Sequence, residues 1–359
     1  MNALKARLKE ADPDPAYPYL AARVRGMMSR LLSASDFGRL IESADLARFV
    51  QALQASDYGS EIAAVKQDAP SIPRIDEAVR RHLGRTWDAL GRAARGRAGE
   101  MVEALFFEWD LASLLGVIRG IHHGRPAAEV LDGAVPTPRF SEAVLAHLAG
   151  LADLDAISAV LSLWKDPFSL PFRRGLEGYA RTGDPIVMEE VLTRESLASV
   201  MSRLDSIEGD GKGLAAYLSM VADGLGLVSA FRSRGTEAEV APISGGRLRA
   251  ADLLFVRNAP TLQEAIDGLK NRLGLPGFVA RGLRPDHPRP AAEVERLAAL
   301  WRARFVDAAA RRDPLSAFLT ASFVHSKIHE AARIRALARS KEHGMPKGVQ
   351  IEALALGIA

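Results

Sequence analysis

DLASLLGVIRGIHHG, residues 110–124, is the stretch that decides the fold, because its pattern occurs three times in the chain. An acid is followed by an aliphatic residue at plus four, arginine at plus nine and glycine at about plus fourteen. The three copies are Asp110 with Leu114, Arg119 and Gly124; Asp223 with Leu227, Arg232 and an early Gly235; and Glu330 with Ile334, Arg339 and Gly344. A pattern that recurs at long, nearly regular intervals indicates tandem structural units.

A second shared stretch lies about eighty residues before each copy of the motif. Its three occurrences align without a gap, and the step from the first to the second equals the step from the second to the third. The aligned apolar positions are Leu32, Leu46 and Leu53; Phe140, Leu154 and Leu161; and Leu248, Leu262 and Leu269. Three such units fit a chain of 359 residues, and we predict them at residues 1–135 (with an N-terminal extension), 136–245 and 246–359.

The composition predicts an all-α fold, because alanine, leucine, arginine and glutamate dominate and β-branched runs are few. Each unit is expected to contain short helices followed by a long pair. The predicted long pairs are Ile75–Leu90 with Met101–Ile121, Ile186–Leu204 with Leu214–Phe231, and Ala291–Ala310 with Pro314–Ser340. The predicted shorter helices include Tyr19–Leu32, Leu46–Leu53, Phe140–Leu151, Leu154–Trp164 and Leu262–Leu273.

The size of the repeat bears on how the units are arranged. Solenoid repeats usually have about 20 to 50 residues and need polar end caps. The repeat found here is more than twice as long, which makes each copy nearly a domain. We therefore expect three small helical domains around a pseudo-threefold axis, with a central hollow.

Charge and cysteine content exclude several classes of function. Lysine and arginine (47) exceed aspartate and glutamate (44) by only three, which is too little to argue for a nucleic-acid-binding face. The absence of cysteine excludes disulfides and thiolate metal sites. The N-terminus lacks the apolar core of a signal peptide, and the richest apolar stretch, 104–118, is interrupted by Glu108 and Asp110. We expect a soluble, cytoplasmic protein.

Two patterns that resemble chemical sites are incomplete. His325 and His329 have the spacing of two metal ligands on a helix, but Ser326 stands where a hydrolytic zinc helix has glutamate, and no third ligand is evident. The glycine-rich segment 209–213 lacks the first glycine and the Ser/Thr of a phosphate-binding loop. We therefore predict no catalytic residue, no metal and no cofactor.

The motif residues are the candidate functional positions. Acid and arginine lie nine residues apart, on opposite faces of one helix, so they cannot pair with each other. Two interpretations stay open, namely structural ion pairs within each unit and contact with a partner protein. The candidates are Asp110, Arg119, Asp223, Arg232, Glu330 and Arg339, together with Arg23 and Arg25 on the polar face of the first helix.

Several segments together resemble a known family. They are Tyr17-x-Tyr19-x-x-Ala22-Arg23-Val24-Arg25, then Trp109-Asp110-Leu111 with Leu114 and Arg119, and Asp313-Pro314-Leu315 followed by Lys327, Glu330, Arg335 and Gly344-Met345-Pro346. In this order they resemble the C subunit of the prokaryotic V/A-type ATPases, which is similar to the d subunit of the eukaryotic vacuolar ATPase. The sequence departs from the family at Ser113, Gly226 and Arg333, where the family has asparagine.

The resemblance implies a non-catalytic rotor subunit. Members of the family are funnel-shaped, all-helical proteins of three domains, present in one copy on the cytoplasmic face of the membrane. They join the central-stalk subunits D and F to the proteolipid ring, so that ATP turnover is coupled to H⁺ or Na⁺ transport; their contact with the membrane is indirect, through the ring. The resemblance implies no nucleic-acid partner. The alternative is a helical adaptor that binds nucleic acid or another assembly through basic faces, and steep salt dependence would distinguish it.

Overall fold

The computed structural model describes residues 16–65, 70–131, 134–205, 207, 210–235, 242–273 and 289–356. In these residues the regular structure is helical and includes no strand, which confirms the all-α prediction. The segment 209–213 is described only from Asp210 onward, and most of the polar loop 274–290 lies outside the described residues.

The helices follow the predicted order of short helices and long pairs. The first group is α2 (Ala16–Met28), α3 (Ala34–Glu42), α4 (Leu46–Gln54), α5 (Gly59–Ala64), α6 (Ile72–Ala93) and α7 (Arg97–His122). The second group is α8 (Ala127–Leu131), α9 (Glu142–Ala149), α10 (Leu154–Leu163), α11 (Ser169–Thr182), α12 (Pro185–Asp205) and α13 (Gly211–Arg232). The third group is α14 (Ala250–Asn258), α15 (Leu262–Leu273), α17 (Pro290–Arg312), α18 (Ala317–Glu342) and α19 (Lys347–Leu356).

All six predicted long helices are present, each within a few residues of its expected ends. Among the shorter helices, α5, α8, α11, α14 and α19 were not predicted. The glycines of α11 explain how it fits the fold. A Cβ at Gly175 would lie 2.9 Å from the backbone oxygen of Met188, so this glycine lets α11 lie directly against α12.

The motif glycine ends its helix in the same way in all three copies. Gly124, Gly235 and Gly344 have positive φ angles of 61°, 76° and 61°, a conformation that glycine adopts without strain. At the ends of α7 and α18 the next N–H closes the turn, because Arg125 donates to the Gly120 carbonyl and Met345 to that of Ser340, both at 2.9 Å. The glycine at plus fourteen is therefore a helix stop.

The apolar cores combine helices from different predicted units. One cluster joins α2–α7 to α18 along most of its length. A second joins α9–α13 to α7 and to the α17–α18 region, and a third joins α14, α15 and α17 to α13. Each layer of short helices therefore packs on its own first long helix and on the motif helix of the preceding unit. The layer α3–α5 packs on α18, which is the motif helix of the last unit.

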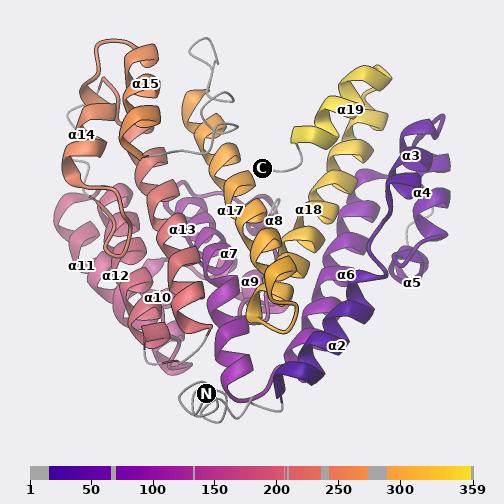
Figure 1. The fold of residues 1–359 in the computed structure, drawn as a ribbon, viewed down its shortest axis with the longest axis horizontal. Coiled ribbons are helices and arrows are strands. Elements are labelled where there is room, and N and C mark those ends of the chain that lie inside the picture. The colour runs from indigo at the N-terminus through magenta and orange to yellow at the C-terminus, as the bar shows by residue number, and fades with distance from the viewer. Residues whose placement is uncertain are drawn as a thin grey trace, which may run out of the picture.

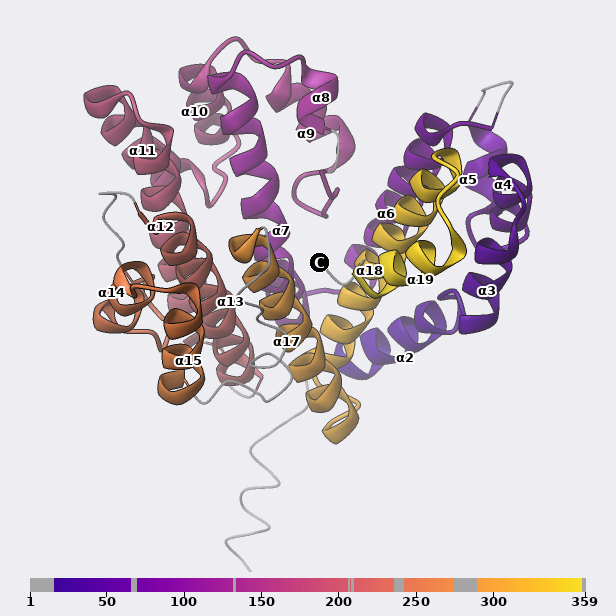
Figure 2. The ribbon, with the colours of Figure 1, turned by 90° about the horizontal axis from the view of Figure 1, so that it is seen from above.

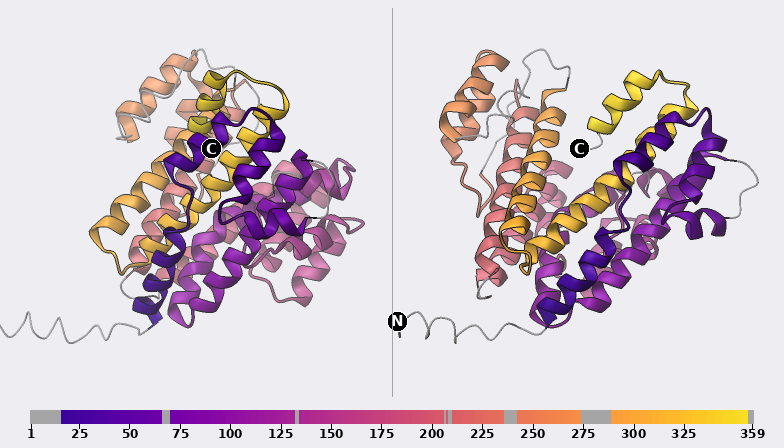
Figure 3. Two further views of the ribbon diagram at one scale, coloured as in Figure 1. Left: turned by 90° about the vertical axis from the view of Figure 1, so that its right-hand side faces the viewer. Right: turned by 45° about the vertical axis from the view of Figure 1, so that its right-hand side comes forward.

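The arrangement in space follows from this packing. In Figure 1 the long helices come together at the lower end and spread apart toward the upper end, and Figure 2 shows the three groups lying around the meeting point of α7, α13, α17 and α18. The last helices (yellow) run beside the first (indigo) in both views of Figure 3, in agreement with the contacts between α18 and α2, α4 and α6.

One described helix, α13, is long and apolar enough to span a membrane by length and composition. The prediction that 104–118 is the richest apolar stretch was therefore wrong. Seventy-two per cent of the apolar window of α13 is buried inside the protein, which is the behaviour of a core helix.

Candidate functional site: three joints made by the repeated motif

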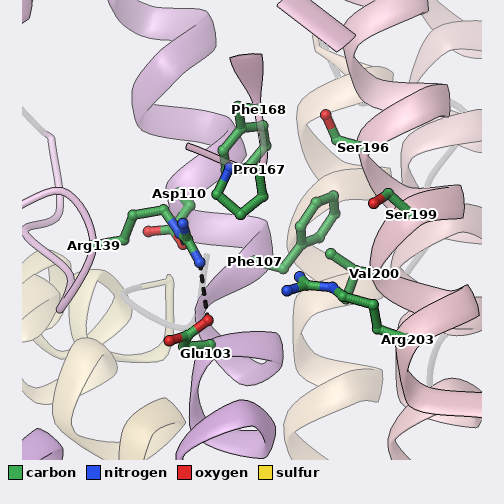
Figure 4. A pocket seen from close by; sticks show the side chains of 10 residues that line it. All are labelled: Glu103, Phe107, Asp110, Arg139, Pro167, Phe168, Ser196, Ser199, Val200 and Arg203. Carbon is green, nitrogen blue, oxygen red and sulfur yellow. Dashed lines mark hydrogen bonds and ion pairs between the residues drawn. The ribbon is translucent and has the colours of Figure 1, made fainter. Parts of the chain in front are cut away.

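The motif acid of α7 is buried, with 2% of Asp110 exposed. Its Oδ1 accepts a hydrogen bond from Thr137 Oγ1 at 2.5 Å, and Thr137 Oγ1 accepts one from the backbone N–H of Phe140 at 2.9 Å. Arg139 Nε lies 3.4 Å from Asp110 Oδ2, and the same guanidinium contacts Glu103 (Figure 4). It also contacts Asp166. Asp110 thus binds the loop that enters α9, the first helix of the next short layer.

The acid of α13 makes the same kind of contact one unit later. Asp223 is 4% exposed, and its Oδ1 accepts hydrogen bonds from the backbone N–H groups of Arg247 and Leu248 at 2.7 and 3.0 Å. Arg247 Nε also donates to Oδ2 at 3.2 Å. These residues form the loop that enters α14.

The acid of α18 binds the beginning of the chain. Glu330 is 4% exposed, and its Oε2 accepts a hydrogen bond from the backbone N–H of Leu32, just before α3. Its Oε1 accepts one from Tyr58 Oη at 2.8 Å and one from the buried Lys327 Nζ at 2.5 Å. Lys327 Nζ also lies 4.7 Å from the centre of the Tyr58 ring. The third unit is therefore attached to the first by a buried charged cluster.

The three contacts are equivalent by sequence. Leu32, Phe140 and Leu248 are the aligned positions of the repeat, and each supplies a backbone N–H to its acid, directly or through Thr137. Arg139 and Arg247 stand at one aligned position and both contact the acid. The first copy has Leu31 there, and Lys327 supplies the cation instead. The shared spacing of the two arginines is a signal that sequence reasoning missed.

The motif arginines form a second set of contacts between units. Arg119 makes a bidentate pair with Glu189 of α12, at 2.7 and 2.5 Å. Arg232 lies 3.5 Å from Glu295 of α17, and Arg339 lies 3.2 Å from Asp76 of α6. The acceptors Asp76, Glu189 and Glu295 precede the motif acids of their own units by nearly equal spacings, so they repeat as well.

Each arginine therefore joins a motif helix to the first long helix of the following unit. The pairs of the motif arginines cross the predicted boundaries, whereas Glu330 also pairs with Lys327 of its own predicted unit. The expectation that acid and arginine do not pair with each other is confirmed. The residue types were informative, but the partner of each was set by tertiary packing.

We call the contacts made by Asp110, Asp223 and Glu330 the first, second and third joints. Burial shifts the pKa values of ionisable groups in the first and third joints. Burial raises the pKa of Asp110 to about 7, against the hydrogen bond from Thr137 and the charge of Arg139, which lower it. Burial lowers the pKa of Lys327, and the adjacent Glu330 opposes that shift. Burial and the nearby Glu330 carboxylate raise the pKa of Tyr58 well above its usual range, so Tyr58 stays a neutral donor.

A central polar cluster links the three motif helices. Tyr217 Oη of α13 donates to Glu108 Oε1 of α7 at 2.5 Å and lies 3.0 Å from His325 Nε2 of α18. Arg302 of α17 pairs with the other oxygen of Glu108 at 2.8 Å. Burial lowers the pKa of His325 well below its usual value and that of His329 to about 4, so both rings are neutral at pH 7. These histidines serve packing and hydrogen bonding in this cluster.

The remaining features of the site are its potential metal ligands and its cavities. No group of three potential metal ligands is present in the described part of the chain. The pocket beside Asp110 and Arg139 has a volume of only about 10 Å³ (Figure 4), too small for a substrate. A larger cavity of about 210 Å³ lies between α6 and the α8–α9 region, lined mainly by alanine, leucine and proline, with Arg80 and Glu142 in its wall. Arg80 pairs with Glu142 at 3.1 Å.

Arg23 and Arg25 are both exposed on α2. Arg25 donates to the backbone oxygen of Pro314 at 3.2 Å, which ties α2 to the α17–α18 turn. The structure thus brings together the motif acids with loop N–H groups and the motif arginines with long-helix acids, but it does not bring Arg23 to either set.

Comparison with known proteins places this repeated architecture in a family. The profile of the ATP synthase (C/AC39) subunit matches residues 20–349. The chain belongs to this family. It is 28% identical over 346 residues to the C subunit of the V-type ATP synthase of Thermus thermophilus, covering 94% of this chain and 97% of that protein.

Two other relatives have the same kind of name. The chain is 26% identical over 336 residues to the C subunit of the A-type ATP synthase of Haloquadratum walsbyi, covering 91% of this chain and 94% of that protein. It is 26% identical over 274 residues to the C subunit of the V-type ATP synthase of Deinococcus radiodurans, covering 72% and 76%. The resemblance to the V/A-type C subunits that the sequence motifs indicated is confirmed.

The departures from the pattern expected for this family have a structural explanation. Ser113 Oγ donates to the Val135 carbonyl at 3.4 Å, and the Arg333 guanidinium lies over the Phe37 ring at 5.8 Å. Gly226 faces Leu253, whose methyl groups lie 3.6 Å from the position a Cβ would take. Gly226 and Arg333 meet Leu253 and Phe37 of the following unit, and Ser113 meets Val135 at the end of its own unit, so the side chain at this position follows the local packing. An amide is not required there.

Proposed function

We propose that this chain is a non-catalytic rotor element, a socket that couples the central stalk to the membrane-embedded proteolipid ring. The partners we infer are stalk subunits D and F and the ring, with one copy of the chain per complex at the cytoplasmic face. Through this coupling, ATP turnover would drive H⁺ or Na⁺ transport, or the reverse. Family membership supports a place in a rotary ATPase, and the proposal concerns the role within it.

The observation that carries the proposal is the contact between Glu330 and Leu32. It joins the last motif helix to the first short layer, after the same contact has joined the first unit to the second and the second to the third. A torque-bearing body needs a rigid path around its circumference. A closed cycle of contacts supplies that path, whereas an open row would leave its first and last units unconnected.

We further propose that the predicted units 1–135, 136–245 and 246–359 are pseudo-equivalent and close into a funnel around a central hollow. The spreading of the long helices in Figure 1 and the three groups in Figure 2 support this arrangement. In this proposal the stalk enters where the helices spread, and the ring lies at the end where they meet. The apolar cavity between α6 and the α8–α9 region is then a candidate contact for an apolar side chain of the stalk.

Co-purification tests the socket directly. The tagged full chain is mixed with recombinant stalk subunits D and F, and the complex is measured by native mass spectrometry at about 50 and about 300 mM salt, on either side of physiological ionic strength. A one-to-one-to-one complex that survives the higher salt is expected. A matched pair of variants sharpens the test, with Leu131→Asp in the cavity wall expected to weaken the complex and Leu163→Asp, at an exposed leucine on α10, expected to leave it intact.

The same experiment examines the adaptor alternative. Binding to nucleic acid should weaken steeply and log-linearly with salt, because counterions are released from phosphate. If the folded chain forms no complex with D and F but binds nucleic acid with such a slope, the socket proposal is wrong.

A further inference from the structure

One end of the molecule is formed by three equivalent turns. They connect α6 to α7, α12 to α13, and α17 to α18, and Figure 1 shows all three toward its lower end. We call this surface the turn face. It is defined by the exposed residues Tyr19, Arg92, Arg95, Arg97, Lys212, Arg311, Arg312 and Leu315.

Direct contacts hold the turns and α2 together. Asp210, at the start of α13, accepts a hydrogen bond from the backbone N–H of Ala317 at 2.6 Å, which joins the second turn to the third. Arg25 of α2 donates to Pro314 of the third turn. The helix α2 in turn packs along α6 and α7, beside the first turn. The turn face is therefore one surface assembled from three units.

The arginines of this surface differ from the motif arginines in their partners. Arg92, Arg95, Arg97, Arg311 and Arg312 are exposed, and none of them pairs with a carboxylate in the part of the chain that the structure describes. This contrasts with the motif arginines, each of which contacts an acid of the next unit. The first turn carries three arginines with no acid between residues 92 and 97. The second and third turns carry Asp210 and Asp313 beside Lys212, Arg311 and Arg312, so the positive charge is most concentrated on the first turn.

Apolar groups stand among these charges. Leu315 is 53% exposed at the tip of the third turn, and Tyr19 is 57% exposed on the first turn of α2. Arginine interspersed with exposed tyrosine and leucine is the composition of surfaces that rest on lipid headgroups, where the charges meet phosphate and the apolar groups enter the interface. A surface spread over three turns also suits a sheet of headgroups, which extends in two dimensions.

We propose that the turn face binds anionic phospholipid headgroups directly. This goes beyond the socket function, in which the membrane is reached only through the ring, and it assigns the basic end to the membrane side. A juxtamembrane basic residue contributes about 1 kcal/mol to binding an anionic surface. Five such arginines would hold the subunit at the membrane while each single contact stays weak.

Vesicle co-sedimentation of the full chain tests the proposal, with vesicles of pure phosphatidylcholine and vesicles containing phosphatidylglycerol. Binding to the anionic vesicles only is expected, and it should weaken as salt is raised. The pair R311Q/R312Q should lower the partition coefficient about thirtyfold, from about 1 kcal/mol per neutralised residue. The pair R95E/R97E should lower it at least as much, and glutamate in the first turn of α7 is compatible with the helix dipole.

Control variants make the outcome specific. Arg173 and Arg181 of α11 are also exposed, and R173E/R181E changes the net charge by the same amount as R95E/R97E away from the turn face. This control should bind like the wild type. Equal loss in the control, or equal binding to neutral vesicles, would overturn the proposal.

A protein partner is the remaining outcome. If the turn-face variants bind vesicles normally but fail to attach to membranes that contain the ring, the arginines serve acidic protein loops and the lipid proposal is wrong. Because the vesicle assay contains neither stalk nor ring subunits, its failure leaves the socket proposal untouched.

Discussion

The carboxylate of Glu330 accepts a hydrogen bond from the backbone N–H of Leu32, 298 residues earlier in the chain. Asp223 makes the same contact with Leu248, and Asp110 makes it with Phe140 through Thr137. In the first and second joints, the peptide chain also continues from the motif helix to the loop that the motif acid binds. No peptide segment connects α18 back to α2, so side-chain and backbone contacts alone maintain the third joint. It is the most informative joint to perturb.

Replacing Glu330 should open that joint. E330Q leaves the ammonium of Lys327 in a site where the residue is only 2% exposed, without its charge partner. Removing one member of a buried ion pair typically costs about 3–5 kcal/mol. We expect a loss of that order in the free energy of unfolding, measured by urea denaturation. Hydrogen exchange should show the largest loss of protection in α3 and in the second half of α18.

The double variant distinguishes the pair from its separate members. K327M/E330Q removes both charges, so it should be more stable than the sum of the single losses predicts. Hydrogen exchange at α9 and α14, which enter the other two joints, should change little. Additive single effects would contradict a coupled closing pair.

The three motif arginines should differ in their contributions. Arg119 pairs bidentately with Glu189, which is only 17% exposed, whereas Arg232 and Glu295 are 56% and 62% exposed and 3.5 Å apart. Exposed pairs contribute about 0–1 kcal/mol, and good bidentate geometry is at the upper end. R119A should therefore destabilise by about 1 kcal/mol and R232A by less than about 0.5 kcal/mol.

Charge swapping tests whether these arginines act through their pairs. R119E should destabilise more than R119A, and R119E/E189R should recover much of the loss, in thermal unfolding monitored by circular dichroism. A swap as unstable as R119E alone would show that Arg119 acts through something other than Glu189.

Reversing the charge of all three motif arginines should loosen the attachment of the stalk or ring or unfold the units. A folded triple variant in a fully coupled enzyme would refute the proposed role of the motif.

Two buried histidines, His82 and His325, and the partly buried His329 should make the protein sensitive to acid. Burial lowers the pKa of His82 to about 2 and that of His329 to about 4, and it lowers that of His325 well below the usual value. The unfolded chain gains protons below about pH 6.5 that the folded chain does not bind, so this contribution to stability is lost as the pH falls. At pH 5 the loss is about 2 kcal/mol for His82 and for His329.

The histidine His82 offers a direct measurement of this effect. It stacks on Tyr58 at 3.9 Å between ring centres and lies near Glu61 and Asp57. H82Q should be less stable at pH 7, but its stability should fall less between pH 7 and 5 than that of the wild type. If the stability of both proteins falls equally between pH 7 and 5, His82 takes up its proton in the folded protein over the same pH range as in the unfolded chain.

The long helices could be predicted because their apolar spacing and capping residues are local properties. Ser71 and Ser316 stand at the N-caps of α6 and α18, and the motif glycines end α7 and α18. The helix α11 was not predicted because its glycines favour a helix poorly in isolation. Its state depends on contact with α12, through Gly175 against Met188, which no local pattern contains.

The site was predictable as a set of residues but not as a set of contacts. The repeat singled out Asp110, Asp223 and Glu330 because each copy needs an acid at the same place. Their partners come from the next unit, and sequence gives no rule for which unit packs on which. Comparison of all three copies would have gone further, because Phe37, Leu145 and Leu253 recur at one aligned position, and Phe37 and Leu253 face the plus-three position of their motifs.

Asp110 should give the first joint a pH dependence opposite to that of the histidines. Its pKa is raised from the ordinary value of 3.8 to about 7, mainly by burial, so the folded chain holds a proton that the unfolded chain has lost. The contribution of this group is fully present below about pH 4 and is lost as the pH rises through about 7. The variant D110N keeps the shape of the side chain without a titrating group. The difference in unfolding free energy between D110N and the wild type, measured from pH 5 to 8, should therefore move in favour of the variant as the pH rises.

The variant T137V serves as a companion to D110N, because it removes the hydroxyl that donates to Asp110. It should be destabilised at every pH, because the Phe140 N–H loses its acceptor. A D110N curve parallel to that of the wild type would show that Asp110 is already ionised in the folded protein, with Arg139 and Thr137 outweighing its burial.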